Sequence, residues 1–281
     1  MRLAMSNIAW SVDERIEAYA ILADAGITGL EIAPGLFFHA AADPFVPDAA
    51  VARDAMREAE SAGLSLVSMQ SLLFGVAGAG LFDGAAACAA LEHGMGRAIA
   101  LAGRFGIRNL VFGSPAQRRV PAGMAMGDAL VQAAELFRRL GDRAASAGTR
   151  ITIEANPAAY GTNFLNTLDE AEAFVERVDH PAIALILDLG AMHMNGSFDT
   201  VPARLPQIAP RLNHVHVSEP DLAPAPADAE ALVPVLQGLR ALGYGKAVSI
   251  EMKRTGHGLA DVARAAGRLA DAAARTGAIH A

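Results

Sequence analysis

Short runs of apolar and β-branched residues alternate along the chain with longer amphipathic stretches that are rich in alanine. The short runs have the length and composition of buried strands, and the longer stretches repeat with a helical period. Strands are predicted at residues 3–8, 27–32, 64–69, 109–112, 151–154, 183–188, 212–217 and 247–251. Helices are predicted at residues 12–25, 48–62, 85–105, 124–147, 167–178, 200–209, 228–242 and 259–276.

The connections between these elements repeat one pattern, in which a helix is followed by glycine, one or two residues, and a strand. The pattern occurs five times, as DAGITGLEI, SAGLSLVSM, RFGIRNLVF, SAGTRITIE and ALGYGKAVSI. Glycine just past the last helical turn is typical of a helix C-terminus, and Ser11 and Thr167 are suitable N-caps. Repeated connections of this kind indicate a parallel sheet whose strands alternate with helices.

Eight strands and eight helices in strict alternation fit either a closed (β/α)₈ barrel or an open doubly wound sheet. An open sheet that binds a dinucleotide normally carries a glycine-rich sequence after its first strand, whereas this chain has AWSVDE there. The count of eight and the length of 281 residues favour the (β/α)₈ TIM barrel. Because no linker interrupts the pattern, residues 1–281 are expected to form one domain. Two long loops, FFHAAADPFVPD and EPDLAPAPADAE, are expected on one rim.

Composition excludes several classes of partner. Hydrophobic residues make up 53% of the chain, and 23 Lys and Arg face 30 Asp and Glu, for a net charge of −7. This balance disfavours nucleic acid as a partner, and no apolar run is long enough to span a bilayer. The N-terminus reaches acidic residues too early for a signal peptide, and the single cysteine, Cys88, fits a reducing compartment and a place in a helix core. A cytoplasmic protein without membrane or nucleic-acid partners is therefore expected.

Potential metal ligands follow the apolar runs in the second half of the chain. They are Glu154, Asp188, His214, His216 and Glu251. In a barrel the strand ends ring one mouth, so these side chains converge. Carboxylates facing one cavity would repel each other unless a cation neutralised them, and a carboxylate-rich set with one imidazole suits Mn²⁺, Mg²⁺ or Co²⁺ better than structural zinc. His214 and His216 share a face of their strand, so the pattern does not rank them.

Other polar residues near the strand ends are candidates for binding substrate. Gln70, Asn156 and Glu219 are expected to contact hydroxyl groups. Arg118 and Arg119, after the fourth strand, either hold an anionic group of the substrate or form a solvated loop pair. His257 and His280 are expected to be solvated.

Several motifs together carry a family resemblance: GITGLEI, ITIEANP, LILDLGAMHMNG, HVHVSEPD and AVSIEM. Over essentially its whole length the chain resembles the xylose isomerase-like TIM barrel superfamily of sugar isomerases and epimerases, which also includes endonuclease IV. The resemblance implies one divalent metal ion, with the ligands Glu154, Asp188, His216 and Glu251, and leaves His214 in the adjoining wall of the substrate site. It also implies a substrate-binding histidine, His193, which lies two residues farther from Asp188 than is usual. The epimerases carry an arginine soon after the strand-7 histidine, and this chain has none there, so its substrate recognition should differ from that of the ketohexose enzymes.

The implied reaction is proton transfer beside a metal-polarised carbonyl of a small carbohydrate, with Glu154 and Glu251 as the two bases. Two bases on opposite faces of the substrate give epimerisation, and one face alone gives aldose–ketose isomerisation. The alternatives are a dehydratase similar to inosose dehydratase and a barrel that binds sugar without catalysis. Cleavage of abasic DNA would need further histidines on strands 2 to 4, where the sequence offers only Glu31. A homodimer is an assembly that the resemblance also allows.

Overall fold

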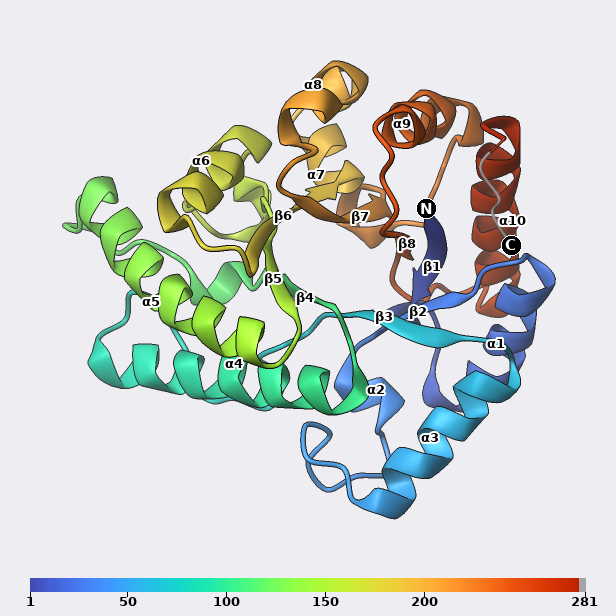
Figure 1. Ribbon diagram of the computed structural model, residues 1–281, viewed down its shortest axis with the longest axis horizontal. Coiled ribbons are helices and arrows are strands. Elements are labelled where there is room, and N and C mark those ends of the chain that lie inside the picture. Colours follow the sequence, from blue (N-terminus) through green and yellow to red (C-terminus); the bar gives the residue numbers. More distant parts are fainter. Residues whose placement is uncertain (278–281) are drawn as a thin grey trace.

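The fold is a closed barrel of eight parallel strands, each paired with its neighbours in chain order and β1 paired with β8 (Figure 1). The computed structural model describes residues 1–277. The strands are β1 (Arg2–Ser6), β2 (Gly29–Ile32), β3 (Ser65–Met69), β4 (Asn109–Phe112), β5 (Arg150–Ile153), β6 (Ile183–Asp188), β7 (Leu212–Ser218) and β8 (Ala247–Glu251). This arrangement confirms the predicted (β/α)₈ TIM barrel.

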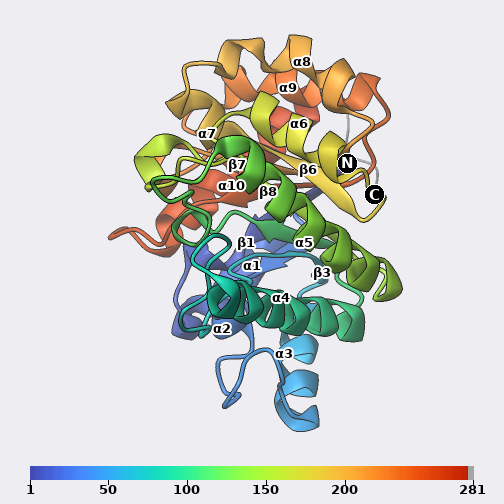
Figure 2. The ribbon, with the colours of Figure 1, turned by 90° about the vertical axis from the view of Figure 1, so that its left-hand side faces the viewer.

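Helices cover the outside of the barrel (Figures 1 and 2). They are α1 (Arg15–Asp24), α2 (Pro34–Phe37), α3 (Ala49–Ser61), α4 (Ala85–Phe105), α5 (Met126–Ser146), α6 (Leu168–Val178), α7 (Leu189–Met194), α8 (Val201–Ile208), α9 (Ala229–Ala241) and α10 (Leu259–Arg275). Short 3₁₀ turns occupy Asn7–Ala9, Val12–Glu14, Pro115–Gln117, Ala158–Tyr160, Phe198–Thr200 and Pro220–Leu222. In both views α4 and α5 lie side by side, and α3 with the loop before it extends from the body of the barrel.

The structure differs from the sequence prediction mainly in short helices at the rim. The four residues of α2 and the six of α7 were not predicted, because neither is long enough to show a helical period. Residues 12–14 form a 3₁₀ turn before α1, and β5 ends at Ile153, one residue before the predicted end. The glycines predicted after the helices, Gly26, Gly63, Gly106, Gly148 and Gly243, all have positive φ angles between 65° and 73°, as their positions require.

The alternation of side chains along each strand separates an apolar layer from a polar one. Val215 and Val217 are buried in the hydrophobic core, whereas His214 and His216 alternate with them on the same strand and belong to the polar set inside the barrel. The sequences ITIE of β5 and VSIE of β8 follow the same alternation. Glu154, directly after β5, and Glu251, the last residue of β8, therefore both lie at inward positions at the mouth of the barrel.

Three smaller predictions concern single residues and the membrane. Cys88 lies in α4, half-buried against the core, and burial raises the pKa of its thiol. His257 is exposed, as predicted, and His280 lies outside the described residues. Within residues 1–277, none of the helices has the length and apolar character needed to cross a bilayer.

Candidate metal centre at the mouth of the barrel

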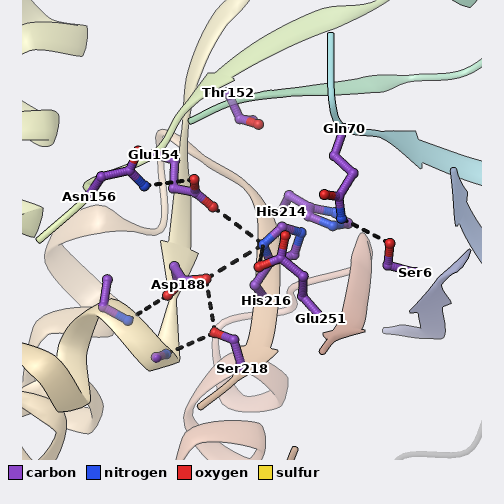
Figure 3. A network of polar contacts seen from close by, with 12 residues as sticks. Ser6, Gln70, Thr152, Glu154, Asn156, Asp188, His214, His216, Ser218 and Glu251 are labelled. Carbon is purple, nitrogen blue, oxygen red and sulfur yellow. Dashed lines mark hydrogen bonds and ion pairs between the residues drawn. The ribbon is translucent and has the colours of Figure 1, made fainter. Parts of the chain in front are cut away.

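Four side chains from four consecutive strands converge at the carboxyl ends of the strands (Figure 3). Nδ1 of His216 lies 3.4 Å from Oε1 of Glu154, 3.5 Å from Oδ2 of Asp188 and 3.2 Å from Oε2 of Glu251. Each residue offers a ligand atom within 4.8 Å of those of the other three. We call these four residues the carboxylate–histidine cluster.

Strand register places the members of the cluster. Asp188 on β6 pairs with His216 on β7, and Glu251 on β8 pairs with Ser218, which lies two residues beyond His216. The backbone amide of Ala191 donates to Oδ1 of Asp188, which makes Asp188 the N-cap of α7. The hydroxyl of Ser218 donates to Oδ2 of Asp188 at 2.9 Å. Both carboxylate oxygens of Asp188 are therefore fixed by hydrogen bonds.

Glu154 is held by its neighbours in sequence and in space. Nδ2 of Asn156 donates to Oε2 of Glu154 at 2.8 Å, which leaves Oε1 facing His216. Gly113, at the end of β4, lies so close that a Cβ atom there would overlap Oε2 of Glu154. The Glu154 carboxylate can occupy this position only because residue 113 has no side chain.

A second group of buried residues lies behind His216. Nε2 of His216 lies 3.0 Å from Oε1 of Glu31, and Nε2 of His214 lies 2.8 Å from Oε2 of the same carboxylate. Nε2 of Gln70 donates to Oε1 of Glu31 at 3.0 Å and to the hydroxyl of Ser6 at 2.9 Å. Glu31 thus contacts the ring nitrogen of His216 that faces away from the cluster. A carboxylate in this position fixes the orientation and tautomer of a metal-binding histidine.

The pKa values of these groups follow from burial and from their partners. Burial would raise the pKa of Glu31, but His216 and His214 hold it well below the usual range. Burial would lower the pKa of His216, yet Glu251 and Glu31 hold it well above the usual range. Burial raises the pKa of Glu251 to about 7, with His216 opposing the shift and the charges of Glu154 and Asp188 adding to it. Burial lowers the pKa of His214.

A cavity of about 410 Å³, here called the mouth cavity, opens above the cluster. It is lined by Pro115, Glu154, Asn156, Tyr160, Asp188, Ala191, Ser218, Glu219, Asp221, Leu222, Glu251 and Lys253. Of the residues predicted to bind substrate, Asn156 and Glu219 line this cavity, whereas Gln70, His193 and His214 do not. The ring of His193 stacks on Phe198 at 3.9 Å and lines a smaller hollow beside α7. His214 faces the opposite end of the barrel.

Arg118 and Arg119 have different surroundings. Arg119 is exposed, but Arg118 is fully buried, and none of its three guanidinium nitrogens has a hydrogen-bond partner within residues 1–277. Burial lowers the pKa of Arg118 to about 10, and the charge of Glu154 opposes this shift. The two arginines are therefore not a solvated pair.

Ser218 and Tyr160 were not among the residues predicted from the sequence. Ser218 follows His216 by two positions, so strand alternation would have placed it on the same face. Tyr160 lies in a 3₁₀ turn of the β5–α6 loop, where no periodicity marks it. Burial raises the pKa of its hydroxyl, which accepts from the backbone amide of Asp221 at 3.3 Å.

The donor set fits a divalent cation. Nδ1 of His216 is buried and makes no hydrogen bond to any of residues 1–277, although three carboxylates surround it. Ligands about 2.1 Å from one octahedral ion lie about 3 to 4.2 Å from each other, which agrees with the limit of 4.8 Å on the separations in this cluster. Oxygen ligands with one imidazole are a set that Mn²⁺, Mg²⁺ or Co²⁺ accepts.

Comparison with solved structures places the fold among those of sugar epimerases. D-psicose 3-epimerase from Clostridium cellulolyticum is 15% identical, with a TM-score of 0.75 and 98% of each chain covered. For 3-keto-D-glucoside 4-epimerase from E. coli the values are 18%, 0.72 and 99% of each chain. An L-ribulose 3-epimerase is 19% identical, with a TM-score of 0.72, over 99% of this chain and 98% of that one.

Two sequence comparisons were made. A search among curated proteins found no match. The family described as xylose isomerase-like TIM barrel matches residues 19–276, which is most of the chain. The chain therefore belongs to the xylose isomerase-like TIM barrel family.

Proposed function

We propose that this protein is a divalent-metal-dependent isomerase or epimerase of a small sugar or sugar derivative. The observation that carries the proposal is the carboxylate–histidine cluster at the floor of the mouth cavity. In TIM barrel enzymes the active site lies at this end of the barrel. The similarity of the fold to epimerases that act on ketoses and on a keto-glucoside supports the same class of substrate.

Glu154, Asp188, His216 and Glu251 would hold the metal ion, which we expect to be Mn²⁺, Mg²⁺ or Co²⁺ rather than Zn²⁺. When bound, such an ion polarises the carbonyl of a hydroxy-ketone and acidifies the adjacent C–H group. Asp188, with both oxygens fixed by Ala191 and Ser218, is suited to holding a ligand in place.

Glu154 and Glu251 are the two bases in this proposal. Glu154 directly follows β5 and Glu251 ends β8, three strands away on the ring, and both line the mouth cavity. A substrate between them presents one face to each carboxylate. One glutamate takes the proton from carbon, and the other returns a proton to the opposite face, which inverts that carbon. The side chains of both are only 12% exposed, and in such a site little bulk water competes for the proton.

Polar groups around the cavity would orient the sugar. Asn156 and Glu219 line it together with Tyr160 and Lys253. Oδ1 of Asn156 is buried and has no hydrogen-bond partner within residues 1–277, so it is available to accept from a substrate hydroxyl. His193, His214 and Gln70 lie outside the cavity, and Gln70 would act through its contact with Glu31.

The test is hydrogen exchange in D₂O with the Mn²⁺-loaded protein and a panel of free and phosphorylated ketoses. We expect deuterium at the carbon beside the carbonyl of one substrate, detected by NMR. Glu154→Gln and Glu251→Gln should each abolish this exchange. Glu92→Gln is the matched control, because Glu92 on α4 is paired with Arg139 outside the cavity.

The outcomes separate this proposal from its alternatives. Undiminished exchange in either glutamine variant would remove the two-base mechanism. Formation of a 2-keto-3-deoxy product would show a dehydratase instead. Binding of a sugar with neither exchange nor product would show a binding protein.

A further inference from the structure

A second hollow lies at the end of the barrel opposite the mouth cavity. It has a volume of about 640 Å³ and is formed where the strands begin. We call it the basal pocket. Its lining includes six glycines and alanines, which leave the space open: Gly106, Ala145, Gly148, Ala182, Gly245 and Ala247.

Four cationic side chains line the basal pocket: Arg2, Arg108, Arg150 and Lys246. No aspartate or glutamate is among its lining residues, and within residues 1–277 none of the four cations has a carboxylate within 4.0 Å. The chain as a whole carries a net charge of −7. An all-cationic pocket in an acidic protein is a local concentration of positive potential that attracts an anion.

Three of the four cations are held in place by uncharged partners. Nζ of Lys246 donates to the carbonyl oxygen of Leu212. Nε of Arg2 donates to the hydroxyl of Thr28 at 3.2 Å, and Nη2 donates to the carbonyl of Thr28 at 2.7 Å. Nη1 of Arg150 donates to Oδ1 of Asn213 at 3.1 Å, and Nδ2 of Asn213 donates in turn to Oδ1 of Asn109. These bonds orient the two guanidinium groups without neutralising them. A ligand would then bind with little loss of side-chain freedom.

Two polar groups in the basal pocket, the Lys246 ammonium and the Thr149 hydroxyl, are in unfavourable surroundings. Burial lowers the pKa of Lys246, and the positive charge of Arg150 lowers it further. The hydroxyl of Thr149 is buried and has no hydrogen-bond partner within residues 1–277. Glu176 and Asp179 line an adjoining hollow that shares Arg150, Pro181 and Lys246 with the basal pocket, and Glu176 pairs with Arg211 at 3.0 Å. An anion in the basal pocket would satisfy groups that the described chain leaves unsatisfied.

We propose that the basal pocket binds the phosphate group of a small molecule. Guanidinium groups match phosphate oxygens in pairs, and an ammonium adds a point charge. Four cations with no acid among them suit a group with two negative charges better than a single carboxylate. This site is independent of the function proposed for the mouth cavity, because it shares no lining residue with that cavity.

The experiment is a calorimetric titration of the metal-free protein with orthophosphate and, separately, with glucose 6-phosphate. Potassium chloride at matched ionic strength and glucose are the reference titrations. We expect saturable binding of at least one phosphate compound, and the compound that binds more tightly identifies free phosphate or a phosphate ester as the ligand. Neither chloride nor glucose should bind saturably.

Arg108→Gln and Arg150→Gln test the cations. The Arg108 side chain makes no hydrogen bond within residues 1–277, so its loss should not disturb the fold. We expect each substitution to weaken binding several-fold and the double variant to weaken it at least tenfold. Arg53→Gln, which removes an exposed positive charge on α3, is the matched control and should bind as the wild type does.

Two results would contradict phosphate binding in the basal pocket. Absence of saturable binding to both phosphate compounds would overturn the proposal. Equal binding by the wild type and the folded double variant, checked by circular dichroism, would also overturn it, because the phosphate would then bind elsewhere.

Discussion

Glu31 connects the inside of the barrel to the candidate metal centre, and its replacement by glutamine tests that connection. The Glu31→Gln variant keeps the shape of the side chain but removes the charge beside His216. In the metal-free protein the Glu31 carboxylate and the His216 ring form a fully buried pair at 3.0 Å. At that distance and an effective dielectric constant of ~20, the attraction between two unit charges is about 5.5 kcal/mol.

Two magnitudes follow from this geometry. Loss of one partner of a buried pair costs about 3–5 kcal/mol, so the free energy of unfolding of metal-free Glu31→Gln should fall by roughly that amount. If His216 held a metal ion through Nδ1, its ring would be neutral and Nε2–H would donate to Glu31. Loss of such a carboxylate partner lowers metal affinity about 10–100-fold. Urea unfolding measures the first quantity, and calorimetric titration with Mn²⁺ measures the second.

Controls separate this effect from a general loss of charge. Glu92→Gln breaks a partly exposed pair with Arg139, so it should cost less than about 1 kcal/mol and leave Mn²⁺ binding unchanged. Gln70→Ala removes one hydrogen bond to Glu31 and should weaken Mn²⁺ binding less than Glu31→Gln does. If folded Glu31→Gln bound Mn²⁺ within twofold of the wild type, the argument that Glu31 orients His216 would be refuted.

Three further predictions concern the cluster itself. Gly113→Ala should fold but bind Mn²⁺ more weakly, because the new Cβ would displace the Glu154 carboxylate from its position. Calorimetry measures the affinity. Ser218→Ala should lower Mn²⁺ affinity several-fold and stability by about 1 kcal/mol, through the lost hydrogen bond to Asp188; the same titration and urea unfolding measure both. Because the pKa of Glu251 is raised to about 7 without metal and that of His216 is held well above its usual range, Mn²⁺ affinity should fall as the pH is lowered, and binding at pH 7 should release protons from both groups. Titrations in buffers of different ionisation enthalpy measure that release.

Each of these predictions has an opposing result. Wild-type Mn²⁺ affinity in Gly113→Ala would show that the Glu154 carboxylate can bind the ion without the space that Gly113 leaves. Unchanged affinity in Ser218→Ala would show that the α7 cap alone fixes Asp188. Affinity independent of pH between 6 and 8 would show that Glu251 is not protonated in the free protein.

The alternation of strands and helices was predictable from sequence because each strand is apolar and each long helix is amphipathic. Residues 85–105, 109–112, 183–188 and 247–251 were predicted with the bounds that the structure has. The short helix α7 was not predictable in this way, because its six residues begin at a cap that Asp188 supplies only once the strand is in place. The local sequence does not predict that tertiary arrangement.

In the candidate site, too, some features were predictable from the sequence and others were not. Convergence of Glu154, Asp188, His216 and Glu251 was predicted because the ends of barrel strands meet at one mouth. The pattern His-x-His could not say which ring reaches the cluster, because both face inward. The two differ in height along β7 by about 7 Å, the rise of two strand residues, and only the closed barrel shows that His214 meets Glu31 from the other end.

One imidazole is contacted from two directions, by the acids at the mouth and by a carboxylate on β2 across the barrel. In the proposed metal centre, the electron-donating strength of Nδ1 of His216 would therefore depend on Glu31, which is not one of the four proposed ligands. Engineering of the proposed metal preference could begin at Glu31 and Gln70, which leaves every residue that lines the mouth cavity unchanged. A library confined to those two positions would separate tuning of the ion from tuning of the substrate.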